Sequence, residues 1–580
     1  MAKKLDNSKT WGFLDEFRGK FFHGEWPTLP ELFTITAQRY PERRAFTVFE
    51  PDRISLSYRE ALQKIKQCAA WLKEQGVQKG DRVVVSGKNS PEWGVVFFAA
   101  GFADAIVVPL DYALHNNEIE SLCNRAKPKI SFFDDEKYAA MTELSRSNPN
   151  IGRVYSLHKK QNEVYVYNLQ AKAPIEVKPS RSEDDMAAIL FTSGTMGNPK
   201  GVMLSHKNFV SDCYIAQTHM HIFHTDVFYA LLPIHHSYTL LAVFIEAVSV
   251  GAEVVFGKSL AVSKMINELT QGEITMLLGV PLLFNKLIAG IMKGIRAKGI
   301  FISGIMQLLM RFSYRVKKLF GVNIGKKLFG AVLTKVGLKN IRIAICGGGP
   351  LAPSVFKKYN ELGIDFVQGY GLTETSPIVA LNPVEHFKIE SVGRYFHPYM
   401  EAKLINQDAD GVGELCFKGS MVMQGYYEMP EETAAVFTED GFFKSGDLGW
   451  IDDEKYIYLM GRAKNMIVTS GGKNVYPEEI ENAFQLYYDE IEQITVKGYK
   501  KDGNNTDEEV EALIYVADAL YKKNNAVRGD VNGDKLVQDQ VNKIIDTVNK
   551  NLQPYQRISK MTFLTAPLEM TTTKKVKRHR

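Results

Sequence analysis

The stretch MAAILFTSGTMGNPKG, residues 186–201, joins an apolar run to a glycine-rich loop and decides the fold class. Its apolar half predicts a buried strand, and the loop after it is punctuated by three glycines. Similar β-branched runs recur on both sides of it, and helical stretches such as residues 58–75 separate them; these runs are DRVVVSG, AIVVPL, EVVFG and IRIAICGGG. The alternation predicts an α/β fold with parallel strands that are largely buried.

The pattern changes in the last third of the chain. GVGELCFKG and GFFKSGDLGWIDDEKYIYLMGR read as short strands joined by Gly and Asp turns, which predicts a small antiparallel section. After Arg462 the strands QITVKGY and EALIYVA and a helical run over residues 537–552 have the size of a separate unit. We therefore expect a large multi-lobed domain over residues 1–461 and a smaller, mobile α+β domain over residues 462–580.

Composition is that of a globular protein, with 580 residues, 45% hydrophobic and 24% charged. The five cysteines are scattered and never form a CxxC pair, which argues against a disulfide framework or zinc site and favours a reducing compartment. The first residues lack the apolar core of a signal peptide. The most apolar window, residues 93–110, contains Asp104 and reads as a buried helix and strand. We expect a cytoplasmic protein without a transmembrane helix.

The glycine-rich loop has the chemistry of a phosphate cradle. Glycines let backbone N–H groups approach an anion, while Thr192, Ser193 and Thr195 add hydroxyl donors and Lys200 adds a positive charge. The loop differs from the P-loop of NTPases because Gly201 follows the lysine where Ser or Thr is required. A surface hairpin remains the alternative interpretation of this loop alone.

Two further motifs suit a nucleotide. QGYGLTETSP, residues 368–377, combines an aromatic ring that could stack on a base with a carboxylate that could bind a metal, although Thr-Glu-Thr after a glycine is also typical of a helix N-cap. IRIAICGGGPLAP reads as a strand that enters a glycine turn. It fails the GxGxxG dinucleotide spacing, because Ala352 occupies the last position.

Charged and histidine-bearing segments complete the candidates. KSGDLGW predicts Asp447 in a turn, and GRAKNMIVTSGGKNVYPEEIE contains Arg462 and Lys464, each of which could also be a plain surface charge. LLPIHHSYT and HMHIFH suggest a metal site, but they lack i, i+4 spacing and accompanying Cys or Asp ligands. Partly buried, hydrogen-bonded histidines are the expected outcome.

Taken in order and spacing from about residue 30 to the end, these motifs resemble the adenylate-forming superfamily of acyl-CoA synthetases, firefly-type luciferases and peptide-synthetase adenylation domains. FTSGTMGNPKGVMLSH and TTTKKVKR are most similar to long-chain acyl-CoA synthetases. The resemblance implies ATP-dependent, Mg²⁺-assisted activation of a long-chain fatty acid to acyl-AMP, followed by transfer to coenzyme A. Two alternatives stay open: transfer to an acyl carrier protein, and an inactive nucleotide-binding membrane scaffold. The scaffold is suggested by Met196, where the family commonly has Thr or Ser, and by Lys574, where it commonly has Gly.

The resemblance also implies residue roles. Tyr370 would stack on adenine, Thr373 would meet the α-phosphate and Glu374 would hold Mg²⁺. Asp447 would accept the ribose hydroxyls, Arg462 would support ribose and phosphate, and Lys464 would be the hinge. His236 would lie near the substrate carboxylate, Gly471 and Gly472 along the CoA channel, and Lys575 would be the catalytic lysine, with Lys574 as the competing position. The remaining implied positions are the cofactor-binding residues Thr192, Ser193, Gly194, Thr195, Gly197, Gly347, Gly348, Gly349 and Gly371, the catalytic Lys200, and Thr192 again as a metal ligand.

One segment suggests a partner beyond the substrates. Residues 274–360 contain fifteen Lys and Arg and no acidic residue. Within them, residues 301–320 form a helical pattern with an apolar stripe and with cations mainly on other faces; the stripe is Phe301, Ile305, Leu308, Leu309, Phe312, Val316, Leu319 and Phe320. Segment 286–342 therefore suits an anionic membrane on the inner, cytoplasmic face, or an acidic carrier protein. A helix packed on its own domain is equally compatible, and no nucleic-acid partner is expected.

Overall fold

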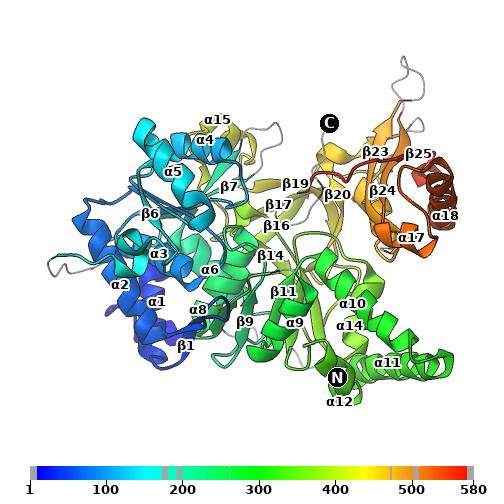
Figure 1. Cartoon of the computed structure of the whole chain (residues 1–580), viewed down its shortest axis with the longest axis horizontal. Coiled ribbons are helices and arrows are strands. Elements are labelled where there is room, and N and C mark those ends of the chain that lie inside the picture. Colours follow the sequence, from blue (N-terminus) through cyan, green and yellow to red (C-terminus); the bar gives the residue numbers. More distant parts are fainter. Residues whose placement is uncertain are drawn as a thin grey trace.

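Two large sheets run through the middle of the protein, and helices cover them. The structure, a computed structural model, describes residues 9–172, 180–192, 199–259, 261–469, 473–487, 489–500, 508–570 and 576. The N-terminal helices lie at one end and the C-terminal strands and helices at the other (Figure 1). The predicted α/β class is confirmed, because parallel strands dominate the first two thirds of the chain.

The first sheet has seven strands and contains the stretch that decides the fold. Its strands β7 and β8 form an antiparallel hairpin, whereas β7, β4, β3, β5 and β6 are parallel neighbours. In spatial order the strands are β18 (Gly425–Tyr426), β8 (Lys200–Ser205), β7 (Met186–Thr192), β4 (Ile106–Pro109), β3 (Arg82–Ser86), β5 (Ile130–Phe133) and β6 (Arg153–Ser156).

The second sheet has thirteen strands and changes direction at β13. From β1 to β13 the neighbours are parallel, and from β13 onwards they are antiparallel, as the sequence predicted for this later section. In spatial order they are β16 (Met400–Ile405), β17 (Gly413–Gly419), β19 (Phe443–Ile451), β20 (Tyr456–Arg462), β15 (Gly393–Tyr395), β14 (Ile378–Leu381), β13 (Asp365–Gly371), β12 (Ile343–Cys346), β11 (Met276–Gly279), β9 (Val227–Ala230), β10 (Glu253–Phe256), β1 (Arg44–Val48) and β2 (Ile54–Ser57). In α/β sheets, ligands commonly bind outside the carboxyl ends of the parallel strands.

Helices fill both sides of these sheets. Helix α3 is apolar all round and fully enclosed, as such a composition requires. Helix α2 starts at Ser57, whose hydroxyl accepts from the Glu60 amide while the Glu60 carboxylate accepts from the Ser57 amide. The α-helices are α1 (Leu29–Arg39), α2 (Tyr58–Glu74), α3 (Pro91–Phe102), α4 (Asn116–Ala126), α5 (Asp135–Ser147), α6 (His206–Ala216), α7 (Ser237–Thr239), α8 (Glu246–Val250), α9 (Val262–Gln271), α10 (Pro281–Arg296), α11 (Ile300–Phe320), α12 (Gly325–Leu328), α13 (Gly330–Lys335), α14 (Pro353–Glu361), α15 (Pro430–Ala435), α16 (Pro477–Ala483), α17 (Asp518–Lys523) and α18 (Val531–Asn549).

The C-terminal part has its own sheet and its own apolar cluster. Strands β23 (Ile491–Tyr499) and β24 (Glu509–Val516) are antiparallel, and β25 (Lys560–Phe563) adds to β24 in parallel. Helix α18 packs its apolar face into a cluster of buried residues that all come from between Ile467 and Ile558. A two-stranded ribbon of β21 (Ile467–Val468) and β22 (Asn474–Val475) precedes them.

Among the residues that the structure describes, none of the helices combines the length and the apolar character that a bilayer crossing requires. The apolar window over residues 93–110 instead forms buried helix α3 and strand β4, as its sequence predicted.

Candidate active site

The predicted strand over residues 186–191 is confirmed as β7, and the loop joins it to β8. Thr192 and Lys200 lie opposite each other at the loop end of this hairpin, and the Thr192 hydroxyl donates to the Lys200 carbonyl oxygen at 3.4 Å. Both ends of the predicted phosphate loop are therefore held at one point of the sheet. Ser193, Gly194, Thr195 and Gly197 lie outside the described residues.

Glu374, Tyr426 and Lys200 meet although they come from three distant segments. Glu374 lies on a single 3₁₀ turn, Thr373–Thr375, just after β13. The Tyr426 hydroxyl donates to Glu374 Oε1 at 2.9 Å, and Lys200 Nζ lies 4.5 Å from the centre of the Tyr426 ring. Burial and the Glu374 charge raise the pKa of Tyr426 above its ordinary value, so its hydroxyl remains a donor at physiological pH.

Tyr426 reaches this position because the chain crosses between the two sheets there. Strand β18 pairs with β8, and Tyr426 lies opposite Val202. On the way, the Met423 amide donates to the Glu374 carbonyl oxygen at 2.8 Å and the Ser376 hydroxyl donates to the Met421 carbonyl oxygen at 2.7 Å. The crossing segment therefore holds the Glu374 turn against the hairpin with one backbone hydrogen bond and one from a side-chain hydroxyl.

Thr373 and the His236 segment also lie together. The hydroxyl oxygens of Thr373 and Ser237 are 3.1 Å apart, and Ser237 directly follows His236. The next residue, Tyr238, donates its hydroxyl to the Ile345 carbonyl oxygen at 3.1 Å. A Cβ on Gly347 would come within 3.0 Å of the Tyr238 ring, so the first residue of the glycine turn is closely covered by this segment.

Tyr370, Asp447 and Arg462 form the second linked group. The Tyr370 hydroxyl donates to Asp447 Oδ2 at 2.6 Å, and Arg462 Nε lies 2.9 Å from Asp447 Oδ1. Burial, followed by the Asp447 charge, raises the pKa of Tyr370 well above its ordinary value, and the same carboxylate is the main cause of the raised pKa of Arg462. The surface-charge alternative is wrong for Asp447, which is buried.

The prediction that Asp447 lies in a turn is also wrong. It lies within β19 and pairs across to Arg462 on β20. The glycine that suggested a turn, Gly446, has φ +71° but sits inside the strand, so the sheet continues through a local irregularity. Lys464 follows in an exposed 3₁₀ turn, Ala463–Asn465.

The glycine turn and the aromatic leave the sheet at the same edge. Strands β12 and β13 are parallel neighbours, with Cys346 opposite Gln368, so Gly347, Gly348 and Gly349 emerge beside Tyr370. Gly348 has φ +78°, which favours glycine. At Gly371 a Cβ would lie 1.7 Å from the Pro377 carbonyl oxygen, so only glycine fits there.

The histidines behave in two ways. His219 is buried and its Nδ1 lies 3.1 Å from the Leu381 carbonyl oxygen, which confirms the expected hydrogen-bonded role. His235 is buried too, but neither ring nitrogen has a hydrogen-bond partner among the described residues. Its Nε2 lies 3.5 Å from Asp111 Oδ2, and ligand atoms of Asp111, His235 and His236 lie within 4.8 Å of one another. The expectation that no aspartate accompanies this pair is therefore wrong, because Asp111 follows a different strand, β4.

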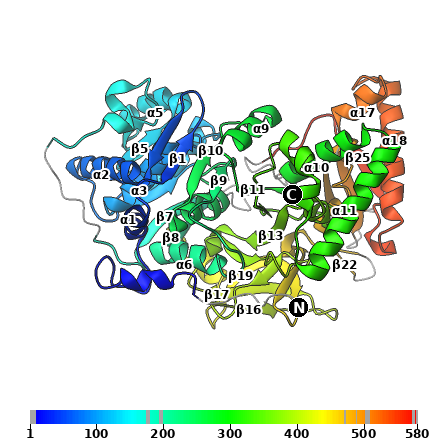
Figure 2. The same cartoon turned by 90° about the horizontal axis from the view of Figure 1, so that it is seen from below.

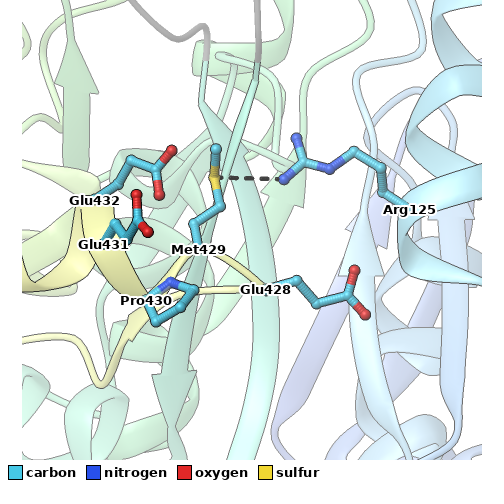
Figure 3. Close-up of a pocket in the computed structure, with 6 residues that line it drawn as sticks. All are labelled: Arg125, Glu428, Met429, Pro430, Glu431 and Glu432. Carbon is cyan, nitrogen blue, oxygen red and sulfur yellow. Dashed lines mark hydrogen bonds between the residues drawn. The ribbon is translucent and has the colours of Figure 1, made fainter.

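An open pocket lies between Arg125 and the start of α15 and is distinct from these groups. Arg125 and three glutamates are among the residues that line it, and Arg125 Nη2 lies 3.5 Å from Met429 Sδ (Figure 3). Arg125 also donates to the carbonyl oxygen of Pro199, at the foot of the loop. Of the predicted ATP-binding residues that the structure describes, none lines this pocket.

Several predicted residues lie outside the described part of the chain: Gly471, Gly472, Lys574 and Lys575. Val576, next to Lys575, forms an isolated antiparallel bridge with Met570. The role of the basic tail therefore stays a prediction.

Two contacts were missed by the sequence reasoning. Tyr426 lies in QGYYEM and Ser237 in HHSYT, and neither stretch has a spacing that signals chemistry. Their positions depend on strand pairing between β18 and β8 and on the turn after β13, which no local pattern encodes.

A sheet that switches direction at an aromatic strand end, beside a strand–glycine loop–strand hairpin, defines an α/β enzyme of the adenylate-forming class. The chain belongs to the AMP-binding enzyme family, which matches residues 33–427. The predicted resemblance is thus confirmed.

Among relatives, a feruloyl-CoA synthase of Amycolatopsis sp is 26% identical over 472 residues, covering 79% of this chain and 84% of its own. A long-chain-fatty-acid–CoA ligase of Bacillus subtilis is 26% identical over 512 residues, covering 81% and 82%. A chloroplastic long-chain-fatty-acid–[acyl-carrier-protein] ligase of Arabidopsis thaliana is 25% identical over 556 residues, covering 82% and 75%. The crystal structure of ATP-bound MatB from Rhodopseudomonas palustris has the same fold, with a TM-score of 0.72, 24% identity and coverage of 95% and 97%.

Proposed function

We propose that this protein is an ATP-dependent long-chain fatty acid–CoA ligase that works through an acyl-adenylate. The observation that carries the proposal is the contact of Tyr426 with both Glu374 and Lys200, because it joins the two phosphate motifs at one point. Relatives that activate feruloyl and long-chain fatty acids support the acid–CoA ligase class. The long acyl chain is the more specific part of the proposal.

In this proposal ATP binds where β12 and β13 end. The Tyr370 ring stacks on adenine beside the glycine turn of Gly347–Gly349. Asp447 accepts the ribose hydroxyls, and its carboxylate is oriented for this by the Tyr370 hydroxyl and by Arg462. Thr192, Gly371 and the loop glycines and hydroxyls would surround the phosphates.

Adenylation needs charge neutralisation more than proton transfer. A carboxylate oxygen of the acid attacks the α-phosphorus of ATP, a new P–O bond forms, and pyrophosphate leaves. Lys200, Thr373 and Lys575 would stabilise the negative charge on the phosphate oxygens. The Glu374 carboxylate and Thr192 hydroxyl are hard oxygen donors that suit Mg²⁺, which when bound supplies further neutralisation of the phosphates.

The second half-reaction would use the C-terminal part as a mobile domain. We place the boundary at 461/462, with Lys464 as hinge; the separate apolar cluster between Ile467 and Ile558 supports a unit that moves as one body. Rotation would bring Gly471 and Gly472 to the CoA channel. The CoA sulfur then attacks the acyl carbonyl beside His236, the thioester bond forms, and AMP and the thiol proton leave.

A carrier-protein ligase is the second candidate function. It keeps adenylation and replaces CoA by the phosphopantetheine of an acidic carrier. Two observations support this candidate. One is the segment that contains fifteen Lys and Arg and no acidic residue, and the other is the relative from Arabidopsis.

The test is ATP–pyrophosphate exchange over a panel of carboxylic acids, followed by product analysis with CoA or with a carrier protein as acceptor. We expect exchange that depends on long-chain acids, and thioester formation with CoA. Exchange only with aromatic or short acids would overturn the proposal that the substrate is a long-chain fatty acid. Tight ATP binding without exchange for any acid would instead indicate the inactive scaffold.

A further inference from the structure

Helix α11 turns its apolar stripe away from the protein. Phe301, Ile305, Leu308, Phe312 and Leu319 recur at helical spacing and form one line along the helix. Their exposed fractions are 80%, 44%, 68%, 55% and 72%. A line of large apolar side chains exposed over five turns is unusual on a soluble surface.

The opposite face of α11 is the one that packs. Its buried residues are Ser303, Met310 and Ser313. Lys317 anchors the same side, with Nζ 2.7 Å from Asp365 Oδ1 and 2.6 Å from Asn360 Oδ1. The helix therefore packs on its own domain through apolar side chains, Met306, Leu309, Met310 and Tyr314, together with the polar residues above. The five exposed residues of the stripe lie outside this contact.

Exposed cations lie next to the stripe. Arg311, Arg315 and Lys318 are exposed on one flank of it, on a face that adjoins the stripe and not on the side opposite to it. Lys317, by contrast, lies on the packed side, where it pairs with Asp365. Residues 274–360 contain no acidic residue; Glu361, which directly follows them, interacts electrostatically with Arg311 and with Lys357 and Lys358. Helix α11 lies beside α10 at the outer edge of the molecule, where a flat surface can reach it (Figures 1 and 2).

We propose that this face of α11 docks on an anionic lipid bilayer. The stripe lies at the boundary of the acyl chains, and Arg311, Arg315 and Lys318 lie at the level of the lipid phosphates. The docking stands on the geometry of α11; the further point, that the bilayer supplies the long acyl substrate, rests on the proposed ligase activity.

A bilayer suits this face better than a protein. A second copy of the chain, related by a two-fold axis, would bring the same cations against one another. An acidic carrier protein could pair with Arg311 and Arg315 through charge alone. Such pairing would leave the five large apolar side chains of the stripe without a contact. Only a lipid surface matches the apolar line and the cations together.

The experiment measures sedimentation of the full chain with vesicles of phosphatidylcholine alone or mixed with phosphatidylglycerol. The triple variant Phe301→Ser, Leu308→Ser, Phe312→Ser should bind mixed vesicles at least about tenfold more weakly, because it removes most of the inserted area. The variant Arg311→Glu, Arg315→Glu should also bind mixed vesicles roughly tenfold more weakly, and added salt should weaken vesicle binding of the unaltered chain.

The matched control is Val527→Ser, Val531→Ser, Leu536→Ser, which removes three equally exposed apolar side chains from the C-terminal part. It should bind mixed vesicles like the unaltered chain. Pyrophosphate exchange without vesicles should be equal in all variants, which reports folding and the ligase proposal independently of docking.

Undiminished binding by the stripe variant would overturn the proposal. So would a dimer of the unaltered chain that the stripe variant dissociates, since the stripe would then be covered by a second copy. The proposal would also be overturned if the chain did not bind vesicles but bound an acidic carrier protein through the stripe. The stripe would then be a docking site for that protein.

Discussion

Tyr426 is the residue on which the two phosphate motifs converge, and its hydroxyl is the part to test. Tyr426→Phe keeps the ring beneath Lys200 but removes the hydrogen bond to Glu374. A carboxylate that has lost such an orienting partner typically holds a metal about 10- to 100-fold more weakly. We expect pyrophosphate exchange to need roughly tenfold more Mg²⁺, with maximal exchange recovered at high Mg²⁺. The neighbouring Tyr427→Phe is the control, and an unchanged Mg²⁺ profile in Tyr426→Phe would contradict the role of the hydroxyl.

Lys575 is the residue whose prediction depends entirely on the family resemblance. If it stabilises the α-phosphate during adenylation, Lys575→Ala should slow exchange by about 100-fold or more, as loss of one preorganised charge does. Thioester formation from preformed acyl-AMP should be spared, since that step would occur after domain rotation. Lys574→Ala decides between the two lysines: if it rather than Lys575→Ala abolishes exchange, the assignment moves by one residue.

At the scale of elements, most of the fold could be predicted because hydrophobic period and length are local properties. The β-branched runs DRVVVSG, EVVFG and IRIAICGGG contain β3, β10 and β12, each with parallel neighbours. The helix expected over residues 58–75 is α2, which ends one residue earlier at Glu74. Each of these segments carries enough apolar residues to be buried, so its structure could be predicted without knowing its packing partner.

What could not be predicted depends on which face of an element meets a neighbour. The period of α11 predicts a helix correctly, but it leaves open whether the apolar stripe packs or faces outwards; in the structure Met310 and Ser313 are buried and most of the stripe is exposed. Asp447 reads as a turn residue because glycine precedes it, yet cross-strand pairing to Arg462 keeps it in β19. The contacts of Tyr426 and Asp111 arise between segments far apart in the sequence. Such positions follow from tertiary pairing and not from spacing.

At the scale of the whole molecule, stability is tied to pH by a carboxyl in the main core. Glu246 lies on α8 and is fully enclosed; its Oε1 accepts from Gln217 Nε2 at 2.8 Å, and Oε2 has no partner among the described residues. Burial raises the pKa of Glu246 from its ordinary value of 4.5 to about 8. The nearby Asp212 carboxyl also has a raised pKa, because of its own burial.

The sign of the effect follows from proton counting. Between pH 4.5 and about 8 the folded protein holds a proton on Glu246 that the unfolded chain has released, so the free energy of unfolding falls as pH rises through this window. Glu246→Gln keeps an acceptor for Gln217 and cannot ionise. We expect it to be close to the unaltered protein in stability near pH 5 and to exceed it by about 4 kcal/mol at pH 9, measured by thermal unfolding at both pH values. The exposed Glu163→Gln should show no such widening with pH, and an equal difference at both pH values in Glu246→Gln would mean that Glu246 is ionised in the folded core.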